Sequence, residues 1–292
     1  MPSQKNHNSL PLIGGHVSAA GGFFHAIENA QRIGANAIQF FGASPRQWYA
    51  KLPTPETVKQ YKDALKNSNV QAVYLHAAYL PNLATASEES YEKSIKSLSE
   101  HLQIVQMIGA QGLIFHMGAY PKDSSRNAAI EQTAKGMKEV LKRTPGSAFL
   151  VMENSAGGGG KLGNTAVELG AIKHLVKSDR VKVCFDTAHG FEAGELGPDV
   201  TPENVKKTFD EWDKEINLKD LIALHVNDSK TKYNSNHDRH ENLGHGEIGL
   251  NGFKALAADK HLHHAAWILE VPGFDNEGPD KENVEILKSC FK

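Results

Sequence analysis

Short apolar runs and longer amphipathic stretches alternate along the whole chain. Runs rich in β-branched and aromatic residues predict strands at residues 13–18, 37–41, 72–77, 112–118, 148–154, 181–190, 222–228 and 265–272. Apolar positions at helical spacing predict helices at residues 23–33, 55–67, 88–108, 126–142, 164–176, 202–212, 252–258 and 281–290. Strand and helix therefore alternate with a repeat of about 35 residues, the order expected of βα units.

Local signals at the predicted helix starts support this division of the chain. Thr54-Pro55, Thr201-Pro202 and Asp280 stand where a helix would begin and have the residue types that cap one. Eight strands, each followed by a helix, predict an α/β fold, a single-domain (β/α)8 TIM barrel. An open doubly wound sheet is the alternative. Because no linker-like segment interrupts the pattern, we expect a polar N-terminal tail at residues 1–12 and one barrel domain at residues 13–292.

Composition places few further limits on the class of protein. The 292 residues are 40% hydrophobic and 23% charged, and no apolar run approaches the roughly 20 residues of a membrane span. Residues 1–10 are polar and lack the apolar segment of a secretory signal. Cys184 and Cys290 are the only cysteines, which excludes a disulfide framework and favours a reducing compartment. We therefore expect a cytoplasmic protein without a membrane partner.

The formal net charge of −2 is a mild argument against a nucleic-acid partner, because proteins that bind phosphates usually carry a basic excess. Bound metal ions would remove that objection. The 15 histidines make a metal site worth considering.

Potential metal ligands stand at the ends of six consecutive predicted strands or just beyond them. In a barrel, the C-terminal ends of the strands and the loops that follow them share one rim, where the chemistry takes place. The strand-end residues are His76, His116, Glu153, Asp186, His225 and Glu270; His189 follows Asp186, and Asp238 and His240 lie in the long loop after the seventh strand. Each residue alone is more often structural than a ligand, but their convergence on one rim predicts a metal centre.

The mixture of ligands constrains the ions. Imidazole and carboxylate without thiolate suit zinc, and also manganese or iron. Nine ligands exceed the needs of one tetrahedral ion but suit three ions that share a bridging carboxylate. Three divalent ions against four carboxylates leave a local positive excess, which attracts a phosphodiester. Two ions roughly 3.5–4 Å apart can stabilise the attacking and leaving oxygens of a displacement at phosphorus.

Motifs around these residues occur in the order known from one enzyme family. They are residues 14–22 (GGHVSAAGG), 44–48 (SPRQW), 76–84 (HAAYLPNLA), 115–118 (FHMG), 153–157 (ENSAG), 186–189 (DTAH), 225–230 (HVNDSK), 238–246 (DRHENLGHG) and 269–270 (LE). The ordered set, which covers about residues 13–272, resembles the endonuclease IV family of apurinic/apyrimidinic endonucleases. Ala77 and Val271 depart from the family pattern. Val271 removes a hydroxyl beside Glu270, which puts hydrogen-bonded support for that residue in question.

The resemblance implies a trinuclear zinc cluster with the following ligands. His76 and His116 would hold one zinc and share Glu153, the catalytic bridge, with a second; Asp186, His225 and Glu270 would complete the second, and His189, Asp238 and His240 would hold the third. The implied reaction is hydrolysis of the phosphodiester 5′ to an abasic site, giving 3′-hydroxyl and 5′-deoxyribose phosphate ends, together with trimming of blocked 3′ ends. Double-stranded DNA carrying such lesions would be the partner, the protein would act as a monomer, and in a bacterium it would associate with the nucleoid.

The same resemblance assigns DNA contacts to Arg46, Tyr79 and Leu80. An abasic sugar must leave the duplex to reach a recessed cluster, so side chains that insert into the minor groove are expected. Tyr79 could instead cap the barrel and Leu80 could belong to the core. The four glycines at residues 157–160 are as consistent with a flexible loop as with a phosphate cradle.

Two other functions are compatible with parts of the pattern. A metal-dependent sugar isomerase or epimerase of the same barrel superfamily would use Glu153, Asp186, His225 and Glu270 for one ion but has no use for the other five ligands as a set. A non-catalytic binder of damaged DNA would have lost at least one ligand of the bridged site, and none is lost.

Overall fold

Eight parallel strands close into a barrel in the computed structural model, which describes residues 10–292. Around the barrel the strand order is β1-β10-β7-β6-β5-β4-β3-β2, and β10 pairs with β1 to close it. The strands are β1 (Ile13–His16), β2 (Ala37–Phe41), β3 (Ala72–His76), β4 (Gly112–Phe115), β5 (Phe149–Glu153), β6 (Val181–Asp186), β7 (Leu221–His225) and β10 (Ala266–Leu269). The closed sheet confirms the predicted (β/α)8 fold and excludes the open-sheet alternative.

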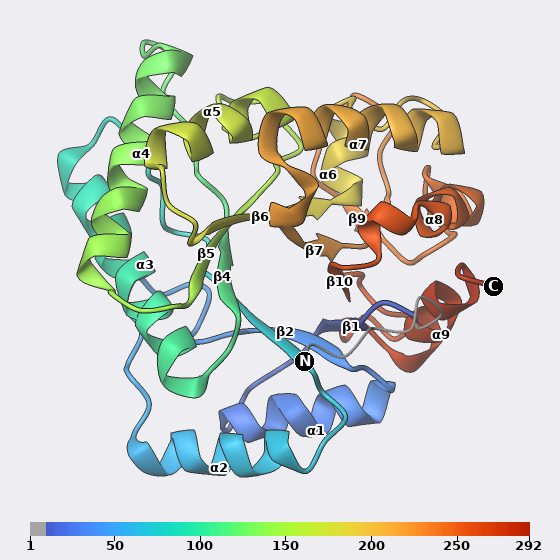
Figure 1. Cartoon of the computed structure of the whole chain (residues 1–292), viewed down its shortest axis with the longest axis horizontal. Coiled ribbons are helices and arrows are strands. Elements are labelled where there is room, and N and C mark those ends of the chain that lie inside the picture. The colour runs from blue at the N-terminus through green and yellow to red at the C-terminus, as the bar shows by residue number, and fades with distance from the viewer. Residues whose placement is uncertain (1–9) are drawn as a thin grey trace, which may run out of the picture.

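Helices surround the sheet as its outer layer (Figure 1). They are α1 (Phe23–Ile33), α2 (Pro55–Lys66), α3 (Glu88–Ile108), α4 (Arg126–Arg143), α5 (Ala166–Val176), α7 (Pro202–Ile216), α8 (Gly249–Ala258) and α9 (Lys281–Ser289). The predicted caps are confirmed, because the side chains of Thr54, Thr201 and Asp280 accept backbone N–H groups in the first turns of α2, α7 and α9. Within residues 10–292, no helix is long and apolar enough to cross a membrane.

The apolar core has two parts. The larger part fills the space between the sheet and the helices. The smaller part lies inside the barrel and contains small side chains such as Ala37, Ala223 and Ala266 around Tyr74, whose hydroxyl donates to Ile222 O at 3.0 Å. Packed apolar side chains therefore fill the interior of the barrel below the rim where the polar residues gather.

Several predicted strands run past their observed ends, and at two places on this rim the structure that follows the strand was also predicted wrongly. The predicted strand 181–190 ends at Asp186, because the Asp186 side chain accepts the His189 N–H and starts a short helix, α6 (Thr187–Glu192). The predicted strand 222–228 ends at His225; Asp228 instead belongs to β8 (Asp228–Ser229), which pairs antiparallel with β9 (His240–Glu241). Short 3-10 helices, Leu218–Asp220 and Lys260–Leu262, precede β7 and β10.

The start of the barrel lies close to the predicted boundary of the tail. Residues 1–9 of the expected tail lie outside the described residues. Leu12 already contacts the sheet, since its carbonyl accepts the Trp267 N–H at 2.7 Å. The chain thus follows the sheet from residue 12 onward.

Candidate metal centre

All nine predicted ligand residues lie at the C-terminal end of the barrel, and most of them form three groups. Within each group the potential ligand atoms lie within 4.8 Å of one another. The groups are His76, His116 and Glu153; Glu153, Asp186, His225 and Glu270; and Asp186, His189 and His240. Glu153 and Asp186 each belong to two groups, so the three groups form one connected centre.

Glu153, the last residue of β5, lies at the middle of this centre. One carboxylate oxygen, Oε2, lies 3.0 Å from His76 Nε2 and 3.5 Å from His116 Nε2. The other, Oε1, lies 2.9 Å from His225 Nδ1 and 3.5 Å from His189 Nδ1. The side chain is 1% exposed. Each oxygen thus faces a different group of histidines, as a bridging ligand requires.

Asp186 connects the centre to the backbone of α6. Its Oδ1 accepts the His189 N–H at 2.9 Å, and its Oδ2 accepts the Asn227 side-chain amide at 2.7 Å. Oδ2 also lies 3.6 Å from His240 Nε2. The same carboxylate therefore caps the helix and faces the third group.

Asp238 lies beside the third group, on the loop between β8 and β9. Its carboxylate oxygens lie 3.3 Å from His189 Nε2 and 3.7 Å from His240 Nε2. Both of these ring nitrogens are buried, and neither has a hydrogen-bond partner among residues 10–292. Buried unpaired nitrogens are costly unless something else satisfies them. Two imidazole nitrogens converging beside carboxylates are the donor set of a zinc-type cation, so these residues fit a metal ion.

The remaining ring nitrogens of three histidines are fixed by the backbone. His76 Nδ1 donates to Ala77 O at 2.8 Å, and His189 Nδ1 donates to Asn154 O at 3.0 Å. His240 Nδ1 donates to Glu270 O at 3.4 Å. In each case Nε2 is left facing the centre, which is how a second contact orients a metal-binding histidine. Since Ala77 contributes its carbonyl, its departure from the family pattern leaves this contact intact.

The charges of the centre favour bound cations. Burial would raise the pKa of Glu153, but His116 and His225 outweigh burial and hold that pKa well below its usual range. Burial would lower the pKa of His189, but Asp186 and Asp238 outweigh it and raise the pKa to about 10. The carboxylates thus stay ionised and attract positive charge, which divalent ions can supply in place of protons. Burial also raises the pKa of the Cys184 thiol to about 12, so this core residue stays protonated and adds no charge to the centre.

Gln39 connects three residues beneath the centre. The sequence pattern did not identify it. This buried β2 side chain accepts from His225 Nε2 at 2.8 Å and donates to Glu270 Oε1 at 2.6 Å. Its amide nitrogen also lies 2.9 Å from His16 Nδ1. Gln39 therefore holds a proton on His225 Nε2 and orients the ring so that Nδ1 faces Glu153 and Glu270. Glu270 is held by Gln39, so its support does not depend on a hydroxyl at Val271.

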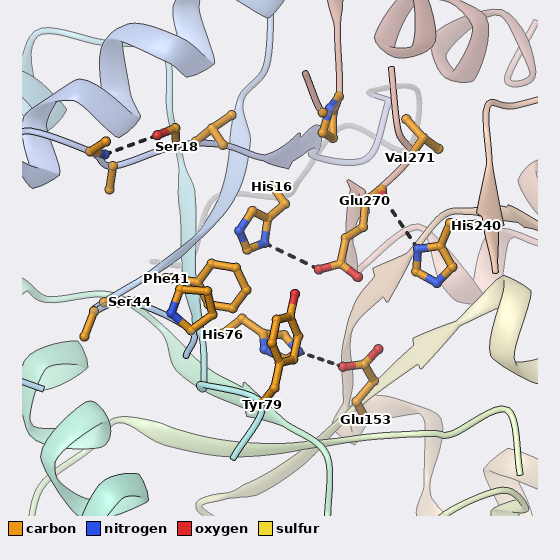
Figure 2. Close-up of a pocket in the computed structure, with 18 of the residues that line it drawn as sticks. His16, Ser18, Phe41, Ser44, His76, Tyr79, Glu153, His240, Glu270 and Val271 are labelled. Carbon is orange, nitrogen blue, oxygen red and sulfur yellow. Dashed lines mark hydrogen bonds and ion pairs between the residues drawn. The ribbon is translucent and has the colours of Figure 1, made fainter. Parts of the chain in front are cut away.

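A cavity of about 830 Å³ opens above the centre. Figure 2 shows His16, His76, Glu153 and Glu270 pointing toward a common space, with Tyr79 at its edge. The Tyr79 side chain is 67% exposed and packs edge-on against Phe41, with ring centroids 5.5 Å apart. Tyr79 therefore lies exposed at the rim and not in the core.

The other predicted DNA-contacting residues lie on the same side of the rim. Arg46 is exposed, and Leu80 is 37% exposed. Their loops are joined by a backbone hydrogen bond from Tyr79 N to Pro45 O at 3.1 Å. The structure thus brings Arg46, Tyr79 and Leu80 to two adjoining loops beside the cavity.

The glycine run at residues 157–160 has a packing role. A Cβ at Gly158 would lie 3.2 Å from the Asn236 side chain, and a Cβ at Gly160 would lie 2.3 Å from Tyr120 O. All four glycines also have positive φ. The run lets the loop after β5 approach the loop that carries Asp238, a position that side chains would block.

A family model and proteins of known sequence match nearly the whole chain. A family model described as "Xylose isomerase-like TIM barrel" matches residues 27–290. A protein of Campylobacter curvus named probable endonuclease 4 is 39% identical over 266 residues, covering 90% of this chain and 93% of that protein. A protein of the same name from Thermosipho africanus is 35% identical over 280 residues, covering 94% of this chain and 97% of that protein.

Solved structures agree with these relatives. The crystal structure of endonuclease IV from Thermus thermophilus superposes with a TM-score of 0.84 at 31% identity, covering 96% of this chain and 98% of that one. The D-psicose 3-epimerase of Clostridium cellulolyticum superposes with a TM-score of 0.64 at 14% identity, covering 96% of this chain and 95% of that one. This likeness shows a shared barrel fold alone.

Proposed function

The chain belongs to the endonuclease IV family, and on that premise we propose that it is a DNA-repair endonuclease that hydrolyses the phosphodiester 5′ to an abasic site. The products would carry 3′-hydroxyl and 5′-deoxyribose phosphate ends. We extend the proposal to trimming of blocked 3′ ends, because the same phosphodiester chemistry at a strand terminus needs no additional group. Its substrate would be double-stranded DNA with either lesion.

The connected ligand groups are the observation that carries this proposal. Three groups that share Glu153 and Asp186 suit three cations held close together. Zinc matches the imidazole and carboxylate donors, and manganese or iron would suit some positions. The proposed ligands are His76, His116 and Glu153 for the first ion; Glu153, Asp186, His225 and Glu270 for the second; and His189, Asp238 and His240 for the third.

Such a cluster, when bound, would supply Lewis acidity to a phosphodiester and a source of water with a lowered pKa. The protein's own part is to position the cluster. Glu153 presents one oxygen to each neighbouring group. Gln39 sets the tautomer of His225, and Asp186 ties the cluster to α6. Burial of these side chains keeps water out and strengthens their electrostatic effect on a phosphate.

We further propose that Arg46, Tyr79 and Leu80 recognise the lesion. Tyr79 presents an exposed ring at the edge of the cavity, and Leu80 is its neighbour in the chain. An aromatic and an aliphatic side chain that enter the minor groove can hold a bend and fill the space beside a flipped-out sugar. Arg46 would contact the phosphate backbone from the adjoining loop.

A sugar isomerase of the same barrel superfamily would need only one of the ligand groups. The residues Glu153, Asp186, His225 and Glu270 could hold its single ion. It would give no role to His189 Nε2 and His240 Nε2, which are buried, face carboxylates and have no hydrogen-bond partner among the described residues. The presence of the third group therefore favours the nuclease.

The test is incision of a 5′-labelled duplex that carries one synthetic abasic analogue, without added magnesium. We expect a single cut 5′ to the analogue that leaves a 3′ end extendable by a polymerase. If a protein shown to contain three metal ions makes no cut, the proposal is wrong, and a screen of ketoses for isomerisation would follow.

A further inference from the structure

The short helix α6 carries two polar residues with different surroundings. His189 belongs to the third ligand group. Glu192 follows three residues later, as the last residue of the helix, and is fully buried outside all three groups. Residues three apart in a helix lie on the same side, one turn from each other. Glu192 is therefore rigidly connected to His189 through one turn of helix.

The Glu192 carboxylate binds the hairpin that carries Asp238 and His240, the other two proposed ligands of the third cation. Its Oε1 accepts from Ser229 Oγ at 2.7 Å, from Thr231 Oγ1 at 3.2 Å and from the Arg239 N–H at 3.2 Å. Ser229 begins the hairpin loop. Arg239 lies directly between the ligands Asp238 and His240. One oxygen atom thus joins both ends of the loop to α6.

The backbone at the end of α6 holds the middle of the same loop. Glu192 O accepts the Asn236 N–H at 2.9 Å, and Phe191 O accepts the Asn234 N–H at 3.1 Å. Both asparagines have positive φ, 58° for Asn236 and 57° for Asn234. This conformation is uncommon for residues other than glycine, and asparagine tolerates it better than most.

Packing alone does not fix Asp238. Its side chain is 43% exposed, whereas the Glu192 side chain beneath the loop is fully buried. Polar contacts with α6 must therefore set the place of this ligand relative to His189.

We propose that Glu192 is a positioning residue for the third cation: it fixes residues 229–240 against α6, so that Asp238 and His240 face His189. The inference rests on the proposed function, because it assigns a role within the proposed cluster. Glu192 does not touch the cation or the substrate. It acts through the loop, and its effect is restricted to one of the three ion positions.

Substitutions of Glu192 differ in what they remove. Glu192→Gln keeps an acceptor oxygen of the same reach, so the two hydroxyls and the Arg239 N–H retain their partner. Glu192→Ala leaves the Arg239 N–H without its acceptor and leaves the Ser229 and Thr231 hydroxyls only their contacts with Thr231 O and His237 O inside the loop, so every side-chain contact from α6 to these groups is lost. Glu195→Gln is the matched control, because Glu195 is a nearby, partly buried carboxylate that accepts from Ala166 and Trp212 and makes no hydrogen bond to the loop among the described residues.

The experiment measures backbone hydrogen exchange of residues 230–239 in the protein as purified, together with zinc content after dialysis against graded chelator. For Glu192→Ala we expect exchange in this segment to accelerate at least tenfold. We also expect one of three zinc ions to be lost at 10- to 100-fold lower chelator strength, the usual effect of removing support behind a ligand. Glu192→Gln and Glu195→Gln should match the wild type in both measurements.

Unchanged exchange and zinc retention in Glu192→Ala would overturn the proposal, and so would loss of all three ions together. If Glu192→Ala does not fold, Glu192→Asp replaces it. The aspartate carboxylate is set back by one methylene, so we expect faster exchange in residues 230–239 than in Glu192→Gln. If the two variants show the same exchange and the same zinc retention, the proposal is overturned. Incision by the wild-type protein separately tests the proposed function, so the two failures are distinguishable.

Discussion

Replacing Glu153 by glutamine should abolish most incision of abasic DNA while the fold is retained. Glu153 is the residue shared by the first two ligand groups, and its two oxygens face different histidines. Glutamine has the same shape but offers one oxygen and one NH2 group, which cannot bind a cation. The substitution therefore removes one bridging contact and one buried negative charge.

The size of the effect follows from the geometry. Ligand atoms in these groups lie within 4.8 Å of one another. One unit charge acting on another at about 4 Å contributes about 4 kcal/mol at an effective dielectric constant of about 20. Since about 1.4 kcal/mol corresponds to a factor of ten in rate, we expect incision to fall about a thousandfold.

Single-turnover incision of the labelled abasic duplex measures this loss, with zinc content and thermal unfolding recorded on the same samples. Glu195→Gln serves as the control, because it neutralises a partly buried carboxylate outside the ligand groups. A Glu153→Gln protein that folds and cuts within threefold of the wild-type rate would refute the shared-ligand mechanism.

Three further predictions concern recognition, support of the centre and stability. Tyr79→Ala should weaken binding of abasic DNA about tenfold, since stacking on an aromatic ring contributes about 1–3 kcal/mol. A fluorescence binding titration measures this loss. The zinc content should stay the same, and loss of zinc would contradict the assigned role. Gln39→Leu should lower zinc affinity 10- to 100-fold by freeing the His225 ring, as measured by chelator competition, and unchanged affinity would show that the contact is dispensable. Burial raises the pKa of Glu195 from 4.5 to about 7, so its stabilising effect is full below pH 4.5 and is lost as the pH rises through 7. Between pH 4 and pH 8 the unfolding free energy of the wild type should therefore fall by about 3 kcal/mol more than that of Glu195→Gln. Urea denaturation of both proteins at a series of pH values measures this, and the same pH dependence in both would contradict the prediction.

The strands, most helices and the positions of the nine ligand residues could be predicted from the sequence because each depends on local signals. Apolar runs define the strands, and Thr54, Thr201 and Asp280 define helix starts through contacts within one turn. Six of the predicted ligand residues stand at or directly after strand ends, so the topology of a barrel is enough to bring them together. The other three, His189, Asp238 and His240, also depend on how α6 and the loop between β8 and β9 pack. Their assignment to particular ions remains a prediction.

What could not be predicted depends on contacts between distant parts of the chain. Gln39 stands in the middle of an apolar strand, and its partners His225 and Glu270 lie 186 and 231 residues away. Helix α6 has too few residues to show a periodic pattern, and its cap, Asp186, was already accounted for as a ligand. The role of Glu192 depends on a hairpin nearly 40 residues further along the chain, as its contact with Ser229 at a separation of 37 residues shows.

The closure of the barrel by β1 and β10 also bears on how the protein is made. Ile13 pairs with Trp267, so the sheet cannot close until all the residues between these two have been synthesised. At about 5–20 residues per second, the first strand waits on the order of ten seconds or more for its partner. Until β10 enters the sheet, β1 is an open edge, and β7 is the other open edge once it has been made; such edges can pair with strands of other molecules. Glu270 follows directly after β10, so the second ligand group is completed only when the last strand enters the sheet. An incomplete nascent chain therefore lacks both a closed sheet and a full ligand set, and it acquires the two in a single step.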